Sequence, residues 1–145
     1  MDELSIEQIR HELTWRLRQK ILYPRQKLYE MEMDKDLEGI HFGAFQNNEL
    51  IAVVSLFPNG NSFQFRKFAV DSDYQYKGIG SKVLNYMTNF AEMEGAALLW
   101  CNARLSAIPF YLKHGFKQTG QLFAKNGFDY EVLEKSLIRS SDQRL

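Results

Sequence analysis

The chain has 145 residues and equal numbers of basic and acidic side chains, 18 of each, so its formal charge is zero. This length fits one domain, expected over residues 1–145, and the balanced charge gives no reason to expect nucleic acid or an anionic membrane as partner. The lone cysteine, Cys101, excludes an intramolecular disulfide, and the sequence lacks the Cys and His spacing of a metal site. The N-terminal Met-Asp-Glu-Leu is not a signal peptide, and no apolar run approaches 18 residues. We therefore expect a soluble, cytoplasmic protein without a metal.

Apolar residues recur every three or four positions at the start of the chain, which favours a helix; they are Ile6, Ile9, Leu13, Leu17 and Ile21. Residues 5–12 can be strand or helix. We expect Thr14 to be an N-cap and the helix to be most secure over 15–22, before Pro24 ends it. Basic residues cluster here, including Arg16, Arg18 and Arg25, and residues 30–38 are acidic. The first interpretation is that both charged groups are solvated faces.

An antiparallel meander is expected next. Residues 39–46 alternate, residues 50–57 are typical of an interior strand, and residues 47–49 and 58–61 carry turn signals. In the strand that follows, Phe63 and Phe65 share one face, whereas Phe68 and Val70 have the opposite parity. One extra residue near Arg66-Lys67 would bring all four into the same core, so we predict a β-bulge there. If both faces are buried, no bulge is needed.

The most informative stretch is Asp71 to Ser81, between this strand and a strongly periodic helix that ends near Glu94 at Gly95. The first N–H groups of a helix lack partners within it, and the helix dipole adds positive potential there. Gly78 and Gly80 leave room for an anion to approach these N–H groups. Neither the dinucleotide fingerprint nor the P-loop pattern is present, so we predict a phosphate site of another kind. A tight turn without a ligand is the alternative.

The rest of the chain predicts a short buried strand over 96–101, parallel to the strand before the helix, and a second helix over 105–114 that Gly115 closes. Residues 116–123 and 128–134 alternate about the hairpin signal Lys125-Asn-Gly127. The polar residues 136–145 are expected to fray.

Two motifs carry a family resemblance. Gln75-Tyr-Lys-Gly-Ile-Gly80 resembles the Gln/Arg-x-x-Gly-x-Gly/Ala pyrophosphate loop of the GCN5-related N-acetyltransferase (GNAT) superfamily. The second motif, residues 102–116, resembles the alanine, aromatic-Tyr and Gly-Phe signature of the same family. The resemblance covers about residues 38–135. It implies a mixed α/β fold: a mostly antiparallel sheet of six or seven strands, a splayed parallel pair in the middle, and about four flanking helices.

The resemblance also implies acetyl-coenzyme A as co-substrate. Its pyrophosphate is expected on the N–H groups of residues 77–81, with Gln75 and the Ser81 hydroxyl nearby. Its pantetheine arm is expected along the main chain of Phe68 and Val70. The expected cofactor-binding residues are thus Phe68, Val70, Gln75, Tyr76, Lys77, Gly78, Ile79, Gly80, Ser81, Asn102 and Arg104. Many family members carry Asn seven residues before the tyrosine, where this chain has Arg104, so either Asn102 or Arg104 is expected at the cofactor.

Family resemblance assigns Tyr111 as the general acid for the departing thiolate; the alternative is that Phe110-Tyr111 is only an aromatic core pair. His41 is the first candidate for the base, because its ordinary pKa suits the task. A structural role for His41 is the more common situation. Three carboxylates are further candidates for the base: Asp36, Glu38 and Glu131. Cys101 is expected to be a buried small hydrophobe. An acyl-cysteine mechanism would need a base beside it, and none is visible.

The leading hypothesis is an enzyme that transfers an acetyl group from acetyl-coenzyme A to a primary amine of a small molecule or peptide, by direct attack in a ternary complex. A non-catalytic acyl-coenzyme A sensing module is the first alternative, and a domain that acts only through protein contacts is the second. The resemblance also implies that residues 15–38 wall the acceptor site. Exposed aromatic residues near the C-terminal hairpin would permit a homodimer.

Overall fold

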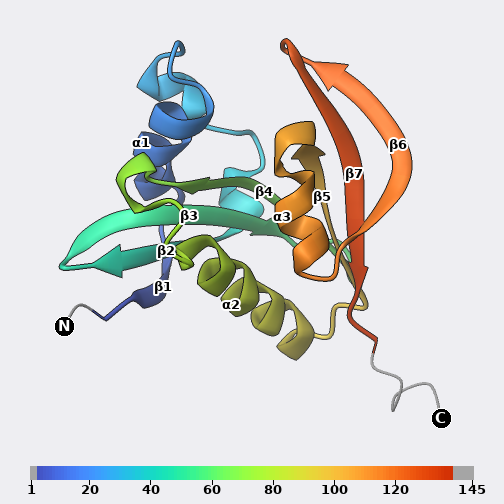
Figure 1. Cartoon of the computed structure of the whole chain (residues 1–145). Helices are drawn as coiled ribbons and strands as arrows, with labels where there is room; N and C mark the ends of the chain where they lie inside the picture. Colours follow the sequence, from blue (N-terminus) through green and yellow to red (C-terminus); the bar gives the residue numbers. More distant parts are fainter. Residues whose placement is uncertain (1–2, 139–145) are drawn as a thin grey trace. The chain divides into compact units, whose positions relative to one another are not determined.

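The computed structural model describes residues 3–138 of the chain, and residues 139–145, where fraying was expected, lie outside them. Seven strands form one mixed sheet in the order β1-β2-β3-β4-β5-β7-β6. The strands are β1 (Ser5–Ile9), β2 (Ile40–Gln46), β3 (Glu49–Phe57), β4 (Ser62–Val70), β5 (Leu98–Arg104), β6 (Lys117–Lys125) and β7 (Phe128–Ser136). The α-helices among the described residues are α1 (Trp15–Leu17), α2 (Ile79–Met93) and α3 (Ile108–Lys113) (Figure 1).

This architecture agrees with the predicted fold class, including the parallel pair β4–β5 in the middle of the strand order. The parallel pairing joins Ser62–Gln64 to Leu98–Trp100, while β4 itself continues to Val70 and β5 to Arg104. No helix within residues 3–138 is both long and apolar enough to cross a membrane.

The chain forms two compact units, which are described separately. The first contains the chain up to Phe57 together with Phe65–Phe90. Its strands β1, β2 and β3 are antiparallel, and Phe42 faces Val54 while Gly43 faces Val53. Adjacent residues of a strand point to opposite faces, so these two pairs mark the two faces of the sheet.

A helix covers each face of this unit. The ring of Phe42 contacts the rings of Tyr86 and Phe90, which places α2 on the Phe42 face. Val53, on the opposite face, packs with Leu17 of α1 and with Ala69 of β4. The face covered by α1 also carries His41 and Ser55, because these two residues are paired and lie two positions from Gly43 and Val53.

Residues 15–22 are helical, as predicted, but they do not form one regular α-helix. Residues 5–9 form a strand, His11–Thr14 form a 3₁₀ turn, α1 is only three residues long, and Arg18–Leu22 form a π-helix. Thr14 occupies the predicted N-cap position of α1, but its hydroxyl donates to the carbonyl of His11 at 2.6 Å and makes no capping hydrogen bond. The next segment contains two further 3₁₀ turns, Leu28–Met31 and Asp36–Glu38.

Strand β4 is irregular at the predicted place. Lys67 has φ 58°, far from the extended conformation of its neighbours, and the rings of Phe65 and Phe68 meet edge to face at 6.4 Å. An extra residue at Lys67 explains why side chains of opposite parity lie together. The expected burial is partly wrong, because Phe68 and Val70 are only half-buried whereas Ala69 is buried on the other face.

The second unit contains Pro58–Gln64 and the chain from Ala91 onward. Strand β5 pairs antiparallel with β7, and β7 pairs with β6 in a hairpin (Figure 1). The turn of this hairpin has positive φ at Asn126 and Gly127, as the sequence predicted. Gly95 and Gly115 end α2 and α3 with φ of 86° and 88°, which confirms both predicted C-caps.

Candidate active site

The turn between β4 and α2 is held by a buried carboxylate. The Asp71 side chain accepts hydrogen bonds from Lys20 Nζ at 3.0 Å and from the Asp73 N–H at 3.3 Å, and its own N–H donates to the Ile51 carbonyl at 2.8 Å. Burial alone would raise the pKa of Asp71, but the hydrogen bonds from Lys20 and from the Asp73 N–H, together with the charges of Lys20 and Arg16, outweigh it and hold this pKa below its usual value. The start of the turn is thus tied to the π-helix and to β3.

The backbone then bends through two residues with positive φ, Tyr76 at 63° and Gly78 at 80°, immediately before α2 begins at Ile79. The Gly78 carbonyl accepts the N–H of Lys82 at 3.2 Å, which closes the first turn of the helix. In any α-helix the first N–H groups have no acceptor inside the helix and point out of its N-terminal end. Lys77 and Gly78 are exposed there. This arrangement can hold an anionic group.

The side chains of three expected cofactor residues in this motif have different surroundings. The Gln75 amide donates to the Val70 carbonyl at 2.9 Å, so its nitrogen stabilises the turn. Tyr76 is fully exposed and Ile79 is buried. The main chain of residues 77–81 is the part of the motif that fits an anion.

Tyr111 of α3 lies in an aromatic cluster, with its ring 5.3 Å from that of Phe110 and 5.6 Å from that of Phe116. Its side chain is buried, and burial, with Cys101 nearby, raises its pKa well above the usual value. The Tyr111 hydroxyl therefore keeps its proton at physiological pH and can donate a hydrogen bond. Burial also raises the pKa of Cys101 to about 12, so this thiol is a poor nucleophile.

Asn102 and Arg104 lie on the same face of β5, opposite to Cys101 and Ala103. Asn102 is exposed, whereas Arg104 is half-buried with its guanidinium carbon 3.8 Å from the centre of the Phe128 ring. Arg104 thus stacks on β7, and Asn102 is the more accessible of the two candidates.

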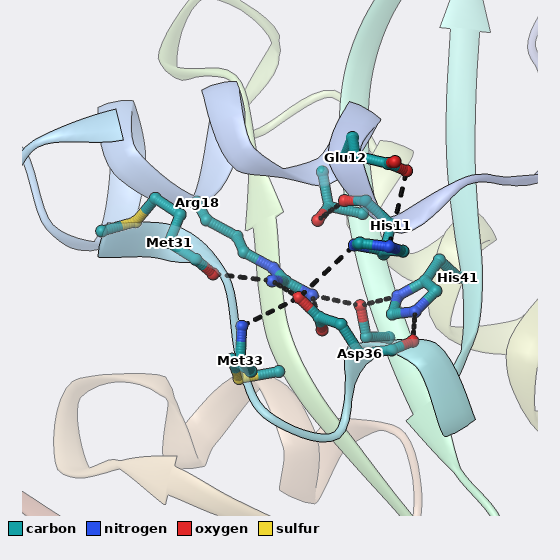
Figure 2. Close-up of polar contacts among 9 residues, drawn as sticks. His11, Glu12, Arg18, Met31, Met33, Asp36 and His41 are labelled. Carbon is teal, nitrogen blue, oxygen red and sulfur yellow. Dashed lines mark hydrogen bonds and ion pairs between the residues drawn. The ribbon is translucent and has the colours of Figure 1, made fainter. Parts of the chain in front are cut away.

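A buried polar cluster, which we call the Arg18 cluster, lies in the first unit (Figure 2). The Arg18 guanidinium donates twice to the Asp36 carboxylate, at 2.9 and 3.0 Å, and also to the Met31 carbonyl and the Ser55 hydroxyl, both at 2.9 Å. Arg18 is completely buried, Ser55 likewise, and Asp36 is 2% exposed. Burial would raise the pKa of Asp36, but hydrogen bonds from Arg18 and from the Met33 N–H keep it below its usual value.

His41 belongs to the same cluster. Its Nε2 lies 2.7 Å from the Asp36 carbonyl and its Nδ1 lies 2.6 Å from the Ser55 hydroxyl. A carbonyl can only accept, so Nε2 carries the proton, and a neutral ring then accepts the Ser55 proton at Nδ1. Burial lowers the pKa of His41, and Arg18 adds to this effect. Both ring nitrogens are occupied, so this geometry does not support His41 as the base.

The carboxylate candidates for the base differ in their surroundings. Asp36 is held by Arg18. Glu131 is buried in β7 and accepts hydrogen bonds from Gln118 Nε2 and the Gly120 N–H, both at 2.9 Å, where the register of β6 shifts. Glu38 is exposed at the end of its 3₁₀ turn.

The sequence alone does not indicate the Arg18 cluster, because Arg18 lies among basic residues that are typical of a solvated face. The available signal was its position, four residues after Thr14 and one after Leu17, both of which are also buried. Its partners, 13 to 37 positions away along the chain, carry no local signal.

The fold and the glycine turn before α2 together define a class of protein. The family model for the acetyltransferase (GNAT) domain matches residues 6–137, so the chain belongs to the GNAT superfamily and is an N-acetyltransferase.

The relatives agree with this assignment. An uncharacterized N-acetyltransferase of Bacillus subtilis (strain 168), YitI, is 26% identical, over 95% of this chain and 99% of that protein. The structure of an IAA acetyltransferase from Bacillus cereus ATCC 14579 aligns with a TM-score of 0.76 at 22% identity, covering 93% of this chain and all of that one. A GNAT acetyltransferase from Elizabethkingia anophelis, solved with acetyl-CoA bound, aligns with a TM-score of 0.73 at 20% identity, covering 92% of this chain and 98% of that one. At these identities the two structures show the fold alone.

Proposed function

We propose that this protein transfers the acetyl group of acetyl-coenzyme A to a primary amine by direct attack in a ternary complex. The observation that carries the proposal is the turn from Tyr76 to Gly78, where two residues with positive φ precede the exposed N-terminal end of α2. A diphosphate matches such a site, because its oxygens accept hydrogen bonds and its charge is favoured by the helix dipole. A relative of the same fold has been solved with acetyl-CoA bound.

Binding of the pantetheine arm is proposed along β4, where the irregularity at Lys67 interrupts the regular strand. A bulge of this kind bends its strand and increases the local twist, so we propose that an extended ligand follows the main chain beside it. Phe68 and Val70, which follow it, are only half-buried. The Val70 carbonyl already accepts the Gln75 amide and has a second lone pair for a ligand.

Tyr111 is proposed as the group that stabilises the departing thiolate. A thiolate with an ordinary pKa of about 8.5 is a weaker base than the buried phenolate would be. With the pKa of Tyr111 raised by burial, its hydroxyl acts as a hydrogen-bond donor and complete proton transfer is uphill.

The acceptor amine must lose a proton before it can attack. A lysine-like amine with a pKa of about 10.4 is neutral in roughly 1 molecule in 2,500 at pH 7, which corresponds to a barrier of about 4–5 kcal/mol. Of the base candidates, Glu38 is the one whose side chain is exposed, and it lies in the segment expected to wall the acceptor site. We propose that the proton leaves directly to Glu38 or through water.

An assay of acetyl transfer to a broad panel of amines tests this function. The transfer is measured by the release of the free thiol of coenzyme A. An amine-dependent rate with mass-spectrometric detection of the acetylated amine is expected. Tight binding of acetyl-coenzyme A with no transfer to any amine would instead support the sensing module. The absence of both binding and transfer would leave a domain that acts through protein contacts.

A further inference from the structure

The segment Leu28–Glu38, which we call the acceptor segment, buries very little of its own apolar surface. Leu28, Tyr29 and Leu37 are 50%, 69% and 85% exposed, whereas Met31 is buried. Its regular structure consists of two single-turn 3₁₀ helices. Hydrophobic burial therefore does little to fix the conformation of this segment.

Arg18 makes up for this lack of apolar burial with polar contacts. Its guanidinium bonds to the Met31 carbonyl near one end of the acceptor segment and to the Asp36 carboxylate near the other, while Ser55 of β3 holds the same guanidinium from the sheet. Asp36 in turn accepts the Met33 N–H at 3.0 Å, and its carbonyl accepts from His41 at 2.7 Å. A single side chain thus connects both turns of the segment to the sheet (Figure 2).

The composition of the cluster favours a positioning role over a role in stability. A buried ion pair is often no more stabilising than apolar residues of the same size, because both charges lose their hydration. Directional bonds, in contrast, fix one arrangement of the groups that they join. The Arg18 Nε remains buried without a hydrogen-bond partner, so the cluster is not optimised for stability.

We propose that Arg18 is the positioning residue of the acceptor segment and thereby sets the affinity of the enzyme for its amine. The inference rests on the proposed function, in which this segment walls the acceptor site. Arg18 is proposed to contact neither acetyl-coenzyme A nor the amine. It acts through the conformation of residues 28–38. Its loss raises the KM for the amine and leaves the binding of acetyl-coenzyme A unchanged.

The test compares the double variant Arg18→Met/Asp36→Leu with Lys135→Met. The double variant removes both buried charges and keeps apolar bulk in their place. Lys135 is the control, because it lies outside residues 15–38 and its ammonium group also donates to a main-chain carbonyl, that of His114, at 2.9 Å. If the double variant does not fold, Arg18→Lys keeps the charge and removes the two-pronged contact with Asp36.

Hydrogen exchange gives the first readout. The amides of Glu30 and Glu38 bond to the carbonyls of Lys27 and Lys35, at 3.0 and 2.9 Å, so neither bond involves the substituted residues. We expect both amides to exchange about tenfold faster or more in the double variant, because the segment opens locally. Unchanged exchange at both positions would overturn the positioning role.

Kinetics give the second readout. The KM for the amine is expected to rise about tenfold or more, with the Kd for acetyl-coenzyme A within about twofold of the unmodified protein. An unchanged KM, or a KM and a Kd that change together, would contradict the proposal. If the unmodified protein acetylates no amine, the proposed function fails, whereas faster exchange at Glu30 and Glu38 would still support the positioning role of Arg18.

Discussion

At the scale of single residues, the partners of His41 determine which of its ring nitrogens donates a hydrogen bond and which accepts one. Arg18 donates to Ser55, Ser55 donates to His41, and His41 donates to the Asp36 carbonyl. Protonation of His41 would reverse the Ser55 bond and leave the serine proton without an acceptor next to a guanidinium. This directionality agrees with the lowered pKa of His41, for which burial is the largest cause.

The lowered pKa of His41 predicts a loss of stability in mild acid. An unfolded histidine takes up a proton below a pH of about 6.5, while the folded ring resists it, so stability is complete above that pH and falls as the pH drops below it. The free energy of unfolding in urea is expected to fall between pH 6.5 and 5, by at most about 1.4 kcal/mol per pH unit for one such group. His41→Gln should flatten this dependence.

His114 is the matched control for that measurement. Burial, with Lys113 and Lys135 nearby, also lowers the pKa of His114. His114→Gln and the double variant therefore separate the two contributions. An unchanged acid dependence in His41→Gln would contradict the assignment to His41.

Tyr111 provides the second prediction at this scale. Tyr111→Phe is expected to lower kcat by roughly 100-fold, because the thiolate loses its hydrogen-bond donor, and to leave the Kd for acetyl-coenzyme A unchanged. Tyr86→Phe, on α2, is the control for loss of a tyrosine hydroxyl. Because the pKa of Tyr111 is raised, its titration should produce no limb in the pH–rate profile below a pH of about 10. Equal kcat values for Tyr111→Phe and the unmodified protein would remove Tyr111 from the mechanism.

At the scale of elements, the turn before α2 can be tested with a matched pair of glycines. Gly78 and Gly60 have φ of 80° and 63°, and a Cβ on either would meet nothing within 4 Å. Both alanine variants therefore carry backbone strain of about 1 kcal/mol without a steric clash. Gly78→Ala is expected to raise the Kd for acetyl-coenzyme A about tenfold by disturbing the anion site, whereas Gly60→Ala should not. Equal Kd values in titration calorimetry would contradict the site.

Elements with a local signal were predictable from the sequence. Asn126-Gly127 forms the predicted hairpin turn, and Gly95 and Gly115 end helices, because positive φ selects glycine and asparagine at each position. The irregularity at Lys67 was also predictable, since the parity of the phenylalanines changes across it.

The N-terminal elements were harder to predict, because tertiary contacts decide them. Ile6 and Ile9 have helical spacing but lie in β1, where pairing with β2 determines the structure. The π-helix at Arg18–Leu22, in which the Tyr23 N–H bonds to the carbonyls of Arg18 and Gln19, has no sequence signal of its own. The same holds for the Arg18 cluster, whose members come from separate elements.

At the scale of the whole molecule, ligand binding should raise stability by mass action. Acetyl-coenzyme A at one hundred times its Kd is expected to add about 2.7 kcal/mol to the free energy of unfolding. For a chain of this size that corresponds to an increase in Tm of roughly 5–10 °C in differential scanning fluorimetry. Adenosine without phosphates, added at the same concentration as acetyl-coenzyme A, should raise Tm much less if the anion site contributes most of the binding free energy. Equal shifts for the two ligands would contradict the phosphate assignment.

The burial of Cys101 has a practical consequence for these experiments. It is the only cysteine of the chain, it is 2% exposed, and burial raises its pKa to about 12. A chromogenic disulfide added to the reaction will therefore count coenzyme A released by the folded enzyme with almost no background from the enzyme itself. Because this thiol can be alkylated only when strand β5 opens, its rate of alkylation measures the opening of this part of the sheet.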